Sequence, residues 1–383
     1  MQNYLAAIMN KKIRPIIKWT GGKYDEFAFF ADHIPAFDRY IEPFFGGGGV
    51  FFALQPKVKT FINDKSTDLI NFYKQITEPA FKNELLKYAT AWDELGLVND
   101  KLWADCSVDF VNYIKGAVTL NQLSEVLAIQ LGEIFKSKLV LNENDFIIDR
   151  ILFEKTLLAS IVDKARRIKR ICDKEDRTFN ETELKAHFET GIRSGAYLFF
   201  RKLLNLQYNK TIELNLAKAA ANWYFVREFC YGAMFRFNAK GEFNIPYGGI
   251  AYNRKNFGQK ASNIFDQAVV QLFKNSAIYN LDFENFLNKV KLKSSDFIFL
   301  DPPYDSEFSE YDQNAFTQAD QQRLAAFLIH TNAKWMVVIK ETDFIRKIYT
   351  HPTVKMVTFS KNYTYNVRGR NDRAVMHLII TNY

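Results

Sequence analysis

The amino-acid sequence predicts an α/β protein whose open mixed sheet carries a helix layer on each face. Short apolar runs alternate with glycine-rich or proline-rich turns in residues 15–73, and the same rhythm returns in residues 297–339. Two further strand-like runs, 355–359 and 375–381, favour antiparallel strands near the end of the chain. The two ends of the chain together supply enough strands for one open sheet.

The middle of the chain has a different character. Residues 78–258 contain long helix-compatible stretches rich in Leu, Ala, Lys and Glu, with few strand-like runs. This change predicts a mostly helical domain inserted into the sheet domain, which is then built from residues 1–77 and 259–383.

Composition and charge narrow the class of partner. The chain of 383 residues is long enough for more than one domain with a buried core. Its 51 Lys and Arg residues exceed its 43 Asp and Glu residues, and the net charge of +8 favours a polyanionic partner. Phe occurs 36 times and Tyr 19 times, and these rings serve either core packing or base stacking.

The three cysteines, Cys106, Cys172 and Cys230, are far apart in the sequence. Their odd number and wide spacing exclude a disulfide framework and a Cys/His zinc cluster, so we expect a reducing compartment and no metal. The first residues contain no long apolar run, and no segment is long and apolar enough to cross a bilayer. We therefore expect a soluble, cytoplasmic protein that has no membrane contact.

The tetrapeptide Asp301-Pro302-Pro303-Tyr304 is the most informative motif. It directly follows the apolar run 297–300, so we expect it at the carboxyl end of a buried strand, where ligands bind in open α/β sheets. The two prolines hold the backbone extended and leave the Pro302 carbonyl outside a regular ladder. The Asp301 carboxylate and this carbonyl form an acceptor pair beside the Tyr304 ring, which suits a planar exocyclic amine. The alternative is a strand-ending turn without chemistry.

A second motif, Glu42-Pro43-Phe44-Phe45 followed by the glycines 46–49, comes after a strand-like Tyr40-Ile41. Such a glycine-rich loop lets a ligand approach the backbone closely. The loop lacks the Gly-Lys-Ser/Thr ending of a P-loop and does not fit the dinucleotide fingerprint, so ATP and NAD sites are disfavoured.

Asp64 ends the next strand-like segment and is the third candidate. An acidic residue about twenty residues after a glycine-rich turn is well placed to accept hydrogen bonds from ribose hydroxyls. An exposed helix N-cap is the alternative for this carboxylate.

Together with the segment Lys18-Trp19-Thr20-Gly21-Gly22-Lys23, these motifs resemble the Dam-type DNA adenine-N6 methyltransferases of the D12 class, alpha type. The resemblance covers the sheet domain at both ends and the stretches 232–236 and 241–246, which look like the hairpin of that family's target-recognition domain. It implies a Rossmann-like class I methyltransferase sheet, a target-recognition domain with a β-hairpin at 78–258, and methyl transfer from S-adenosylmethionine to adenine N6.

The resemblance also implies roles for individual residues. Asp301, Pro302, Pro303 and Tyr304 would be catalytic, with Tyr304 stacked on an adenine that is flipped out of the duplex. Asp64 would hold the ribose, and Asp282 would lie near the adenine of the cofactor, although Asp282 also fits a helix cap. The implied S-adenosylmethionine site comprises Trp19, Gly21, Gly22, Lys23, Glu42, Pro43, Phe44, Gly46, Gly48, Asp64, Asp282 and Asp301.

Duplex DNA is the expected partner, and the insertion is the expected reader of its sequence. The basic run 164–170 contacts phosphates or is a solvated helix face. Arg368, in a tail rich in aromatic residues and arginine, contacts DNA or belongs to a loop that covers the sheet edge. A β-ribbon can enter the major groove, so the candidates for base contacts are the hairpin residues Arg236, Asn238, Lys240 and Asn244.

The predicted reaction is a direct in-line displacement with no metal and no covalent intermediate, after which the amine proton leaves to water. We expect a role in restriction-modification or phage defence, a bacterial or phage origin, a separate cognate restriction endonuclease as partner, and a monomer or weak dimer. Two alternatives remain, namely a methyltransferase for RNA adenine or protein glutamine, and a non-catalytic DNA-binding module with this fold. The basic insertion favours DNA as the substrate.

Overall fold

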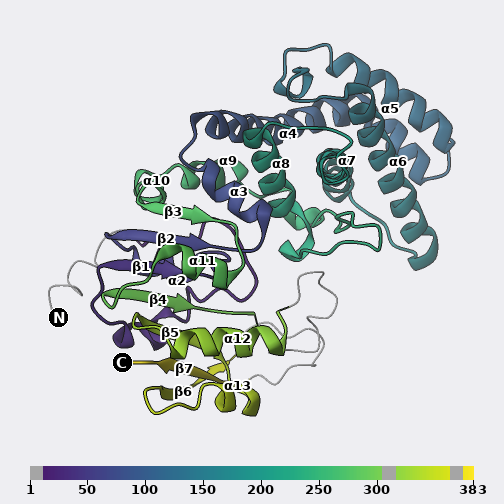
Figure 1. Ribbon diagram of the computed structural model, residues 1–383. Coiled ribbons are helices and arrows are strands. Elements are labelled where there is room, and N and C mark those ends of the chain that lie inside the picture. Colours follow the sequence, from purple (N-terminus) through teal and green to yellow (C-terminus); the bar gives the residue numbers. More distant parts are fainter. Residues whose placement is uncertain (1–11, 304–315, 363–373) are drawn as a thin grey trace. The chain divides into compact units, whose positions relative to one another are not determined.

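The computed structural model describes residues 12–303, 316–362 and 374–383. By its internal contacts the chain divides into unit 1, Met1–Thr77 with Asp266–Tyr383, and unit 2, Glu78–Phe265 (Figure 1). Two residues that the sequence assigns to the site, Tyr304 and Arg368, lie outside the described residues.

Unit 1 is built on a mixed sheet of seven strands in the order β3-β2-β1-β4-β5-β7-β6 (Figure 1). The first five strands of this order are parallel, whereas β7 runs antiparallel to both β5 and β6. The predicted α/β fold with a mixed sheet is therefore confirmed. The strands are β1 Arg39–Glu42, β2 Lys59–Asn63, β3 Ser276–Tyr279, β4 Asp296–Leu300, β5 Lys334–Lys340, β6 Lys355–Asn362 and β7 Ala374–Thr381.

The strand order reverses direction between β1 and β4. From β1 the chain proceeds outward to β2 and β3 on one side, while β4 and β5 extend the sheet on the other side. In open α/β sheets this switch point opens a crevice beyond the carboxyl ends of the strands. The loops that follow Glu42 and Leu300 flank this point, so strand order alone predicts where a ligand of unit 1 binds.

Side chains alternate between the two faces of the sheet because successive residues of a strand point to opposite sides. On one face Ile41, Ile298 and Val337 pack in a single apolar cluster with residues of α11, α12 and α13. On the other face the ring of Phe299 stacks on Phe30, with ring centroids 5.6 Å apart. The helical elements of unit 1 are η2 Phe27–Phe29, η3 Ala31–His33, α2 Gly49–Leu54, α3 Thr67–Gln75, α10 Gln267–Lys274, α11 Phe283–Val290, α12 Gln318–Ile329 and α13 Asp343–Ile348.

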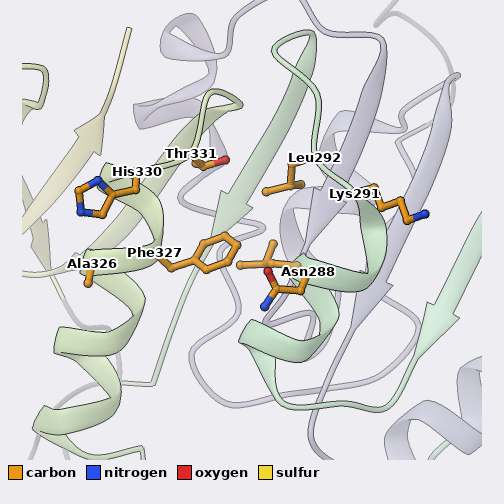
Figure 2. Close-up of a pocket in the computed structure, with 8 residues that line it drawn as sticks. Asn288, Lys291, Leu292, Ala326, Phe327, His330 and Thr331 are labelled. Atoms are coloured by element: carbon orange, nitrogen blue, oxygen red, sulfur yellow. The ribbon is translucent and has the colours of Figure 1, made fainter.

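A groove of about 360 Å³ separates α11 from α12 (Figure 2). Phe327 and Leu292 point into this space, and Lys291 and Thr331 lie where the two helices lead into the following strands. Since these strands are parallel, the groove lies toward their amino ends, away from Asp301. Its lining consists of Leu287, Asn288, Lys291, Leu292, Ala326, Phe327, His330 and Thr331.

Unit 2 is helical. Its α8 is buried on nearly all sides and packs against α4 and α7. Among the described residues, no helix of either unit is both long and apolar enough to span a bilayer. The helical elements are α4 Pro79–Ile114, α5 Leu120–Ile134, η4 Val140–Asn142, α6 Arg150–Glu175, α7 Glu181–Tyr208, α8 Leu216–Phe229, η5 Tyr231–Ala233, η6 Ile250–Tyr252 and α9 Phe257–Ile264.

The second boundary of unit 2 lies at residue 265, seven residues beyond the 258 expected from the sequence. The reason is α9, which continues past residue 258 and packs within unit 2. Its first residue Phe257 packs its ring against Phe225 and Phe229 of α8, with centroids 5.5 and 5.3 Å apart, and Phe265 at its end packs against Phe81 of α4 at 5.7 Å. Between α8 and α9 the chain forms a hairpin-like turn held by two isolated antiparallel bridges, Cys230 with Tyr247 and Phe237 with Phe243.

Helices α6 and α7 approach closely at two glycines of α7. A Cβ atom on Gly195 would lie 2.7 Å from Leu157 Cα, and one on Gly191 would lie 3.0 Å from Ile161 Cα. The distance at Gly195 is shorter than packed carbon atoms allow, and the distance at Gly191 is tight, so the glycines set the separation of the two helices.

Replacing Gly195 by Ala should therefore destabilise the protein by about 1 to 3 kcal/mol, because the added methyl group overpacks the contact with α6. Urea denaturation followed by circular dichroism measures the effect. Gly132→Ala in α5 is the matched control, since its Cβ would meet no atom within 4 Å. This control should be neutral or stabilising, and equal stability of both variants would contradict the packing argument.

Candidate functional site

Asp301 lies directly after β4 and pairs with a lysine from the other end of the chain. The Lys23 ammonium donates to Asp301 Oδ1 at 2.8 Å and to the Gly21 carbonyl at 3.2 Å. Lys23 is 2% exposed, and the Asp301 side chain is 18% exposed. A buried ammonium is costly unless it is paired, so this ion pair fixes the segment 18–24 to the carboxyl end of β4.

The glycine loop after β1 packs against this same segment. A Cβ on Gly46 would lie 2.9 Å from Trp19 Cδ1, and a Cβ on Gly47 would lie 2.9 Å from Trp19 Cβ. A Cβ on Gly49 would lie 2.8 Å from the backbone nitrogen of Lys23. Gly46 also has a φ of +49°, a left-handed conformation that glycine adopts readily. These glycines therefore serve contacts within the protein, a role that the sequence did not predict for them.

Asp64 holds the glycine loop from the neighbouring strand. Its Oδ2 accepts a hydrogen bond from Gly46 N at 2.8 Å, and its Oδ1 accepts one from Ser66 N at 2.8 Å. Burial raises the pKa of Asp64, while the backbone N–H groups of Ser66 and Gly46 lower it. Each carboxylate oxygen can accept a second hydrogen bond. The ribose role of Asp64 stays a prediction, and the structure adds that this carboxylate orders the loop.

Glu42 is the most deeply buried carboxylate of the site, with 2% of the residue exposed. Burial raises its pKa well above the ordinary value, the hydrogen bond from Tyr40 Oη at 2.8 Å lowers it, and the charges of Asp301 and Asp64 raise it further. Glu42, Asp64 and Asp301 thus influence one another electrostatically beside the Lys23 ammonium. A cation bound beside Glu42 and Asp64 would favour the ionised forms of these two carboxyls and lower their pKa values.

Asn63 ties three strand ends together and was not predicted. Its side-chain amide nitrogen donates to the Pro43 carbonyl at 3.1 Å and to the Leu281 carbonyl at 3.0 Å, while its oxygen accepts from Leu281 N at 2.9 Å. The residue is buried. The sequence showed only that an amide residue follows the apolar Phe61-Ile62 at the expected end of a strand, and no local pattern specifies its partners.

Aromatic rings gather beside Phe44. Its ring centroid lies 5.6 Å from Phe283 and 5.4 Å from Phe316, and the last two rings are 5.7 Å apart. The Arg323 guanidinium lies over the Phe283 ring at 4.3 Å. Phe44 was expected here from the sequence, whereas Phe283, Phe316 and Arg323 were not. The rings are inclined to one another, by 36° for Phe44 and Phe283 and by 87° for Phe44 and Phe316, and the face of a single such ring is apolar and of the kind that packs against a purine.

Asp282 is the N-cap of α11 and accepts from Glu284 N at 3.0 Å. Arg323 donates to both of its oxygens, at 2.8 and 2.9 Å, and this hydrogen bonding lowers the pKa of Asp282. The structure therefore shows the helix-cap role that the sequence allowed. Contact with the cofactor stays a prediction for this residue.

The backbone after Asp301 is held by its neighbours. Pro302 is buried, and the carbonyl of Pro303 accepts a hydrogen bond at 2.8 Å from Gln321 Nε2 in α12.

In the described residues, no group of three or more His, Cys, Asp and Glu side chains is arranged to hold a metal ion.

Comparisons with known proteins identify this arrangement. The D12 class N6 adenine-specific DNA methyltransferase family matches residues 19–114 and 158–365, which is more than half of the chain. The chain belongs to this family. The family predicted from the sequence motifs is thereby confirmed, and with it an adenine-specific DNA methyltransferase.

Individual relatives agree with this membership. The type II methyltransferase M.CviBI of Paramecium bursaria Chlorella virus NC1A is 33% identical to this chain. The aligned region covers 43% of this chain and 61% of the viral protein. The type II methyltransferase M.MjaIII of Methanocaldococcus jannaschii is 25% identical over 97% of this chain and 100% of its own length. A DNA adenine methylase of Serratia marcescens is 24% identical over 94% of this chain and 96% of its own length.

In unit 2 of the methyltransferase, α7 anchors the hairpin-like turn. Asn205 exchanges two hydrogen bonds with the backbone of Phe243, at 2.8 and 3.0 Å, and Tyr197 Oη donates to the Ile245 carbonyl at 2.7 Å. Between these anchors Asn244 faces Arg236, whose backbone carbonyl accepts from Asn244 N at 3.3 Å. These hydrogen bonds hold the backbone of the hairpin-like turn in place.

The four polar residues expected to read DNA differ in their availability. Arg236 and Lys240 are exposed. Asn238 instead closes the turn, because its Oδ1 accepts from Lys240 N at 2.9 Å and from Glu242 N at 3.0 Å, and its Nδ2 donates to Glu242 Oε2 at 3.0 Å. An Asn amide occupied on both sides has fewer groups left for a base edge. Arg236 and Lys240 are the better placed candidates in this methyltransferase.

The raised pKa of Glu42 predicts a specific pH dependence of stability in the methyltransferase. Because folding favours the protonated form of Glu42, the native state binds more protons than the unfolded state between the two pKa values. Stability contributed by this group is present below the unfolded pKa and is lost as pH rises through the folded pKa.

Glu42→Gln removes this titration and keeps the shape of the side chain. We expect the thermal midpoint of the variant to exceed that of wild type by a margin that grows with rising pH. Differential scanning fluorimetry across the pH range measures the margin. A difference that stays constant or shrinks as pH rises would contradict the assignment of Glu42 as a buried carboxyl with a raised pKa.

Proposed function

We propose that this chain is a site-specific methyltransferase that moves the methyl group of S-adenosylmethionine to N6 of an adenine flipped out of duplex DNA, in one in-line displacement. The observation that carries the proposal is Asp301, placed after β4 at the switch point of the sheet, paired with buried Lys23, and followed by two prolines. Membership of the family supports adenine and DNA as the substrate.

The residues of the site fit S-adenosylmethionine. This cofactor carries a sulfonium and an ammonium group, and a cation beside Glu42 and Asp64 would favour the ionised forms of these carboxyls, whose pKa values are raised by burial. The aromatic cluster of Phe44, Phe283 and Phe316 suits its adenine ring. We assign the cofactor to Trp19, Gly21, Gly22, Lys23, Glu42, Pro43, Phe44, Gly46, Gly48, Asp64, Asp282 and Asp301.

When bound, S-adenosylmethionine supplies an electrophilic methyl group on its sulfonium. The chain's own residues orient the target amine. The Asp301 carboxylate and the Pro302 carbonyl accept the two amine hydrogens, which favours a more tetrahedral nitrogen whose lone pair points at the methyl group. Lys23 keeps the carboxylate in place for this contact. After transfer the amine proton leaves to water, and Tyr304 stacks on the flipped base.

The helical unit 2 acts as the target-recognition domain in this proposal. Its hairpin-like turn contacts base edges, and basic residues outside the turn contact phosphates. The relatives in Paramecium bursaria Chlorella virus NC1A and Methanocaldococcus jannaschii are named type II methyltransferases, which supports a role in restriction-modification. A separate endonuclease would then cleave the same site in unmethylated DNA. We propose a cytoplasmic enzyme of bacterial or phage origin that acts as a monomer or weak dimer.

The first test is to incubate the protein with methyl-labelled S-adenosylmethionine and mixed-sequence duplex DNA and then to identify the labelled nucleoside. We expect N6-methyladenine. Asp301→Ala should lower the rate of labelling by about 100- to 1000-fold, the loss typical of a group that stabilises the transition state. Asp343→Ala, an exposed carboxylate at the start of α13, is the matched control and should keep the wild-type rate.

Other outcomes of this experiment are equally informative. Label on cytosine would overturn the assignment of the base. The absence of label on DNA while S-adenosylmethionine still binds would move the acceptor to RNA or protein. Near-normal methyl transfer by a folded Asp301→Ala variant would refute the mechanism.

A second test concerns the exposed residues of the hairpin-like turn. Lys240→Ala should weaken binding of all duplex sequences and reduce the slope of log affinity against log salt by about 1. Arg236→Ala should instead reduce the preference for the cognate site over other sequences. Fluorescence anisotropy at several salt concentrations measures both, with Lys101→Ala in α4 as an exposed control. Binding and specificity unchanged in both hairpin variants would exclude the turn as the reader of DNA.

A further inference from the structure

Gln321 occupies an unusual place in α12. The residues of this helix that face the core are Gln321, Leu324, Ala325 and Leu328, which recur at the spacing of one helix face. Three of them are apolar, as burial requires. The remaining one, Gln321, lies nearest the carboxyl ends of the strands, and this amide residue is 0% exposed.

The amide nitrogen of Gln321 contacts the backbone of the catalytic motif. Its Nε2 donates to the Pro303 carbonyl at 2.8 Å. Prolines have no backbone N–H, so residues 302 and 303 cannot be held by donating hydrogen bonds of their own. Only their carbonyls are available, and Gln321 supplies a donor to one of them. This contact fixes the peptide that directly follows the Pro302 carbonyl.

The amide oxygen of Gln321 points to a role other than stability. Oε1 is buried and has no hydrogen-bond partner among the described residues. A buried acceptor that is left unpaired costs free energy, and an apolar side chain of similar size would avoid this cost. The partner carbonyl belongs to Pro303, an exposed residue, and the hydrogen bond is only partly buried, so it adds less to stability than a fully buried one. The fold therefore gains little from a glutamine at this position.

We propose that Gln321 is a positioning residue for methyl transfer. By holding the Pro303 carbonyl it sets the orientation of the preceding peptide, so that the Pro302 carbonyl and the Asp301 carboxylate face the target amine together. It touches neither substrate nor cofactor in this role. The inference rests on the proposed function, because it needs the amine to bind at residues 301 and 302.

The decisive variant is Gln321→Leu, which removes the donor and keeps most of the side-chain volume. We expect kcat to fall about 10- to 100-fold, the effect of a misplacement of about 1 Å at the reacting groups. The Kd for S-adenosylmethionine should stay within about twofold of wild type, because no contact to the cofactor is lost. The thermal midpoint should be unchanged or higher. Gln322→Leu, the exposed neighbour on the same helix, is the matched control and should keep the wild-type kcat.

Gln321→Glu supplies a second readout that a purely structural role would not move. The introduced carboxyl can donate to the Pro303 carbonyl only while it is protonated, and it repels this carbonyl when it is ionised. The kcat of the variant relative to wild type should therefore fall as pH rises. This measurement also decides the question if Gln321→Leu fails to fold.

The outcomes separate cleanly. A folded Gln321→Leu variant with wild-type kcat, or a loss of kcat that only follows a lowered thermal midpoint, overturns the inference. The inference is also overturned if the kcat of Gln321→Glu relative to wild type does not change with pH. Failure of the proposed function shows elsewhere, as absent adenine methylation by wild type or as full activity of Asp301→Ala.

Discussion

The ion pair between Lys23 and Asp301 is the constraint on which the rest of the site depends. It joins two residues 278 positions apart in the chain, and it buries an ammonium that could not be left unpaired. The segment around Lys23 must therefore lie against the carboxyl end of β4. The glycines at 46, 47 and 49 make this possible, because any side chain there would collide with Trp19 or with the backbone of Lys23.

The same edge of the sheet gathers three carboxyl groups. Glu42, Asp64 and Asp301 lie at the ends of β1, β2 and β4, and backbone N–H groups or Tyr40 Oη satisfy part of their hydrogen-bonding capacity. Like charges near one another raise the free energy of the ionised forms, and a cationic ligand would relieve this repulsion. The site thus combines a rigid backbone with an electrostatic preference for a cationic ligand.

Several features of the site could be predicted from the sequence, and others could not. The apolar runs before Asp64 and Asp301 identified both residues as strand ends, and the family was evident from the motifs. The contacts of Asn63, the aromatic partners of Phe44 and the hydrogen bond of Gln321 to Pro303 were not evident. These residues join segments that are distant in the chain, and no local pattern specifies such partners.

By itself the sequence determined the class of fold, the positions of the strand ends and the chemistry of the residues placed there, because hydrophobic periodicity and turn residues act over short distances along the chain. Only the tertiary structure decided which of these residues meet. Strand order placed β1 beside β4, and the parallel register brought Glu42, Asp64 and Asp301 to one edge around Lys23. Contacts of this kind follow from the packing of whole strands and helices, which is a property of the folded chain and not of any single segment.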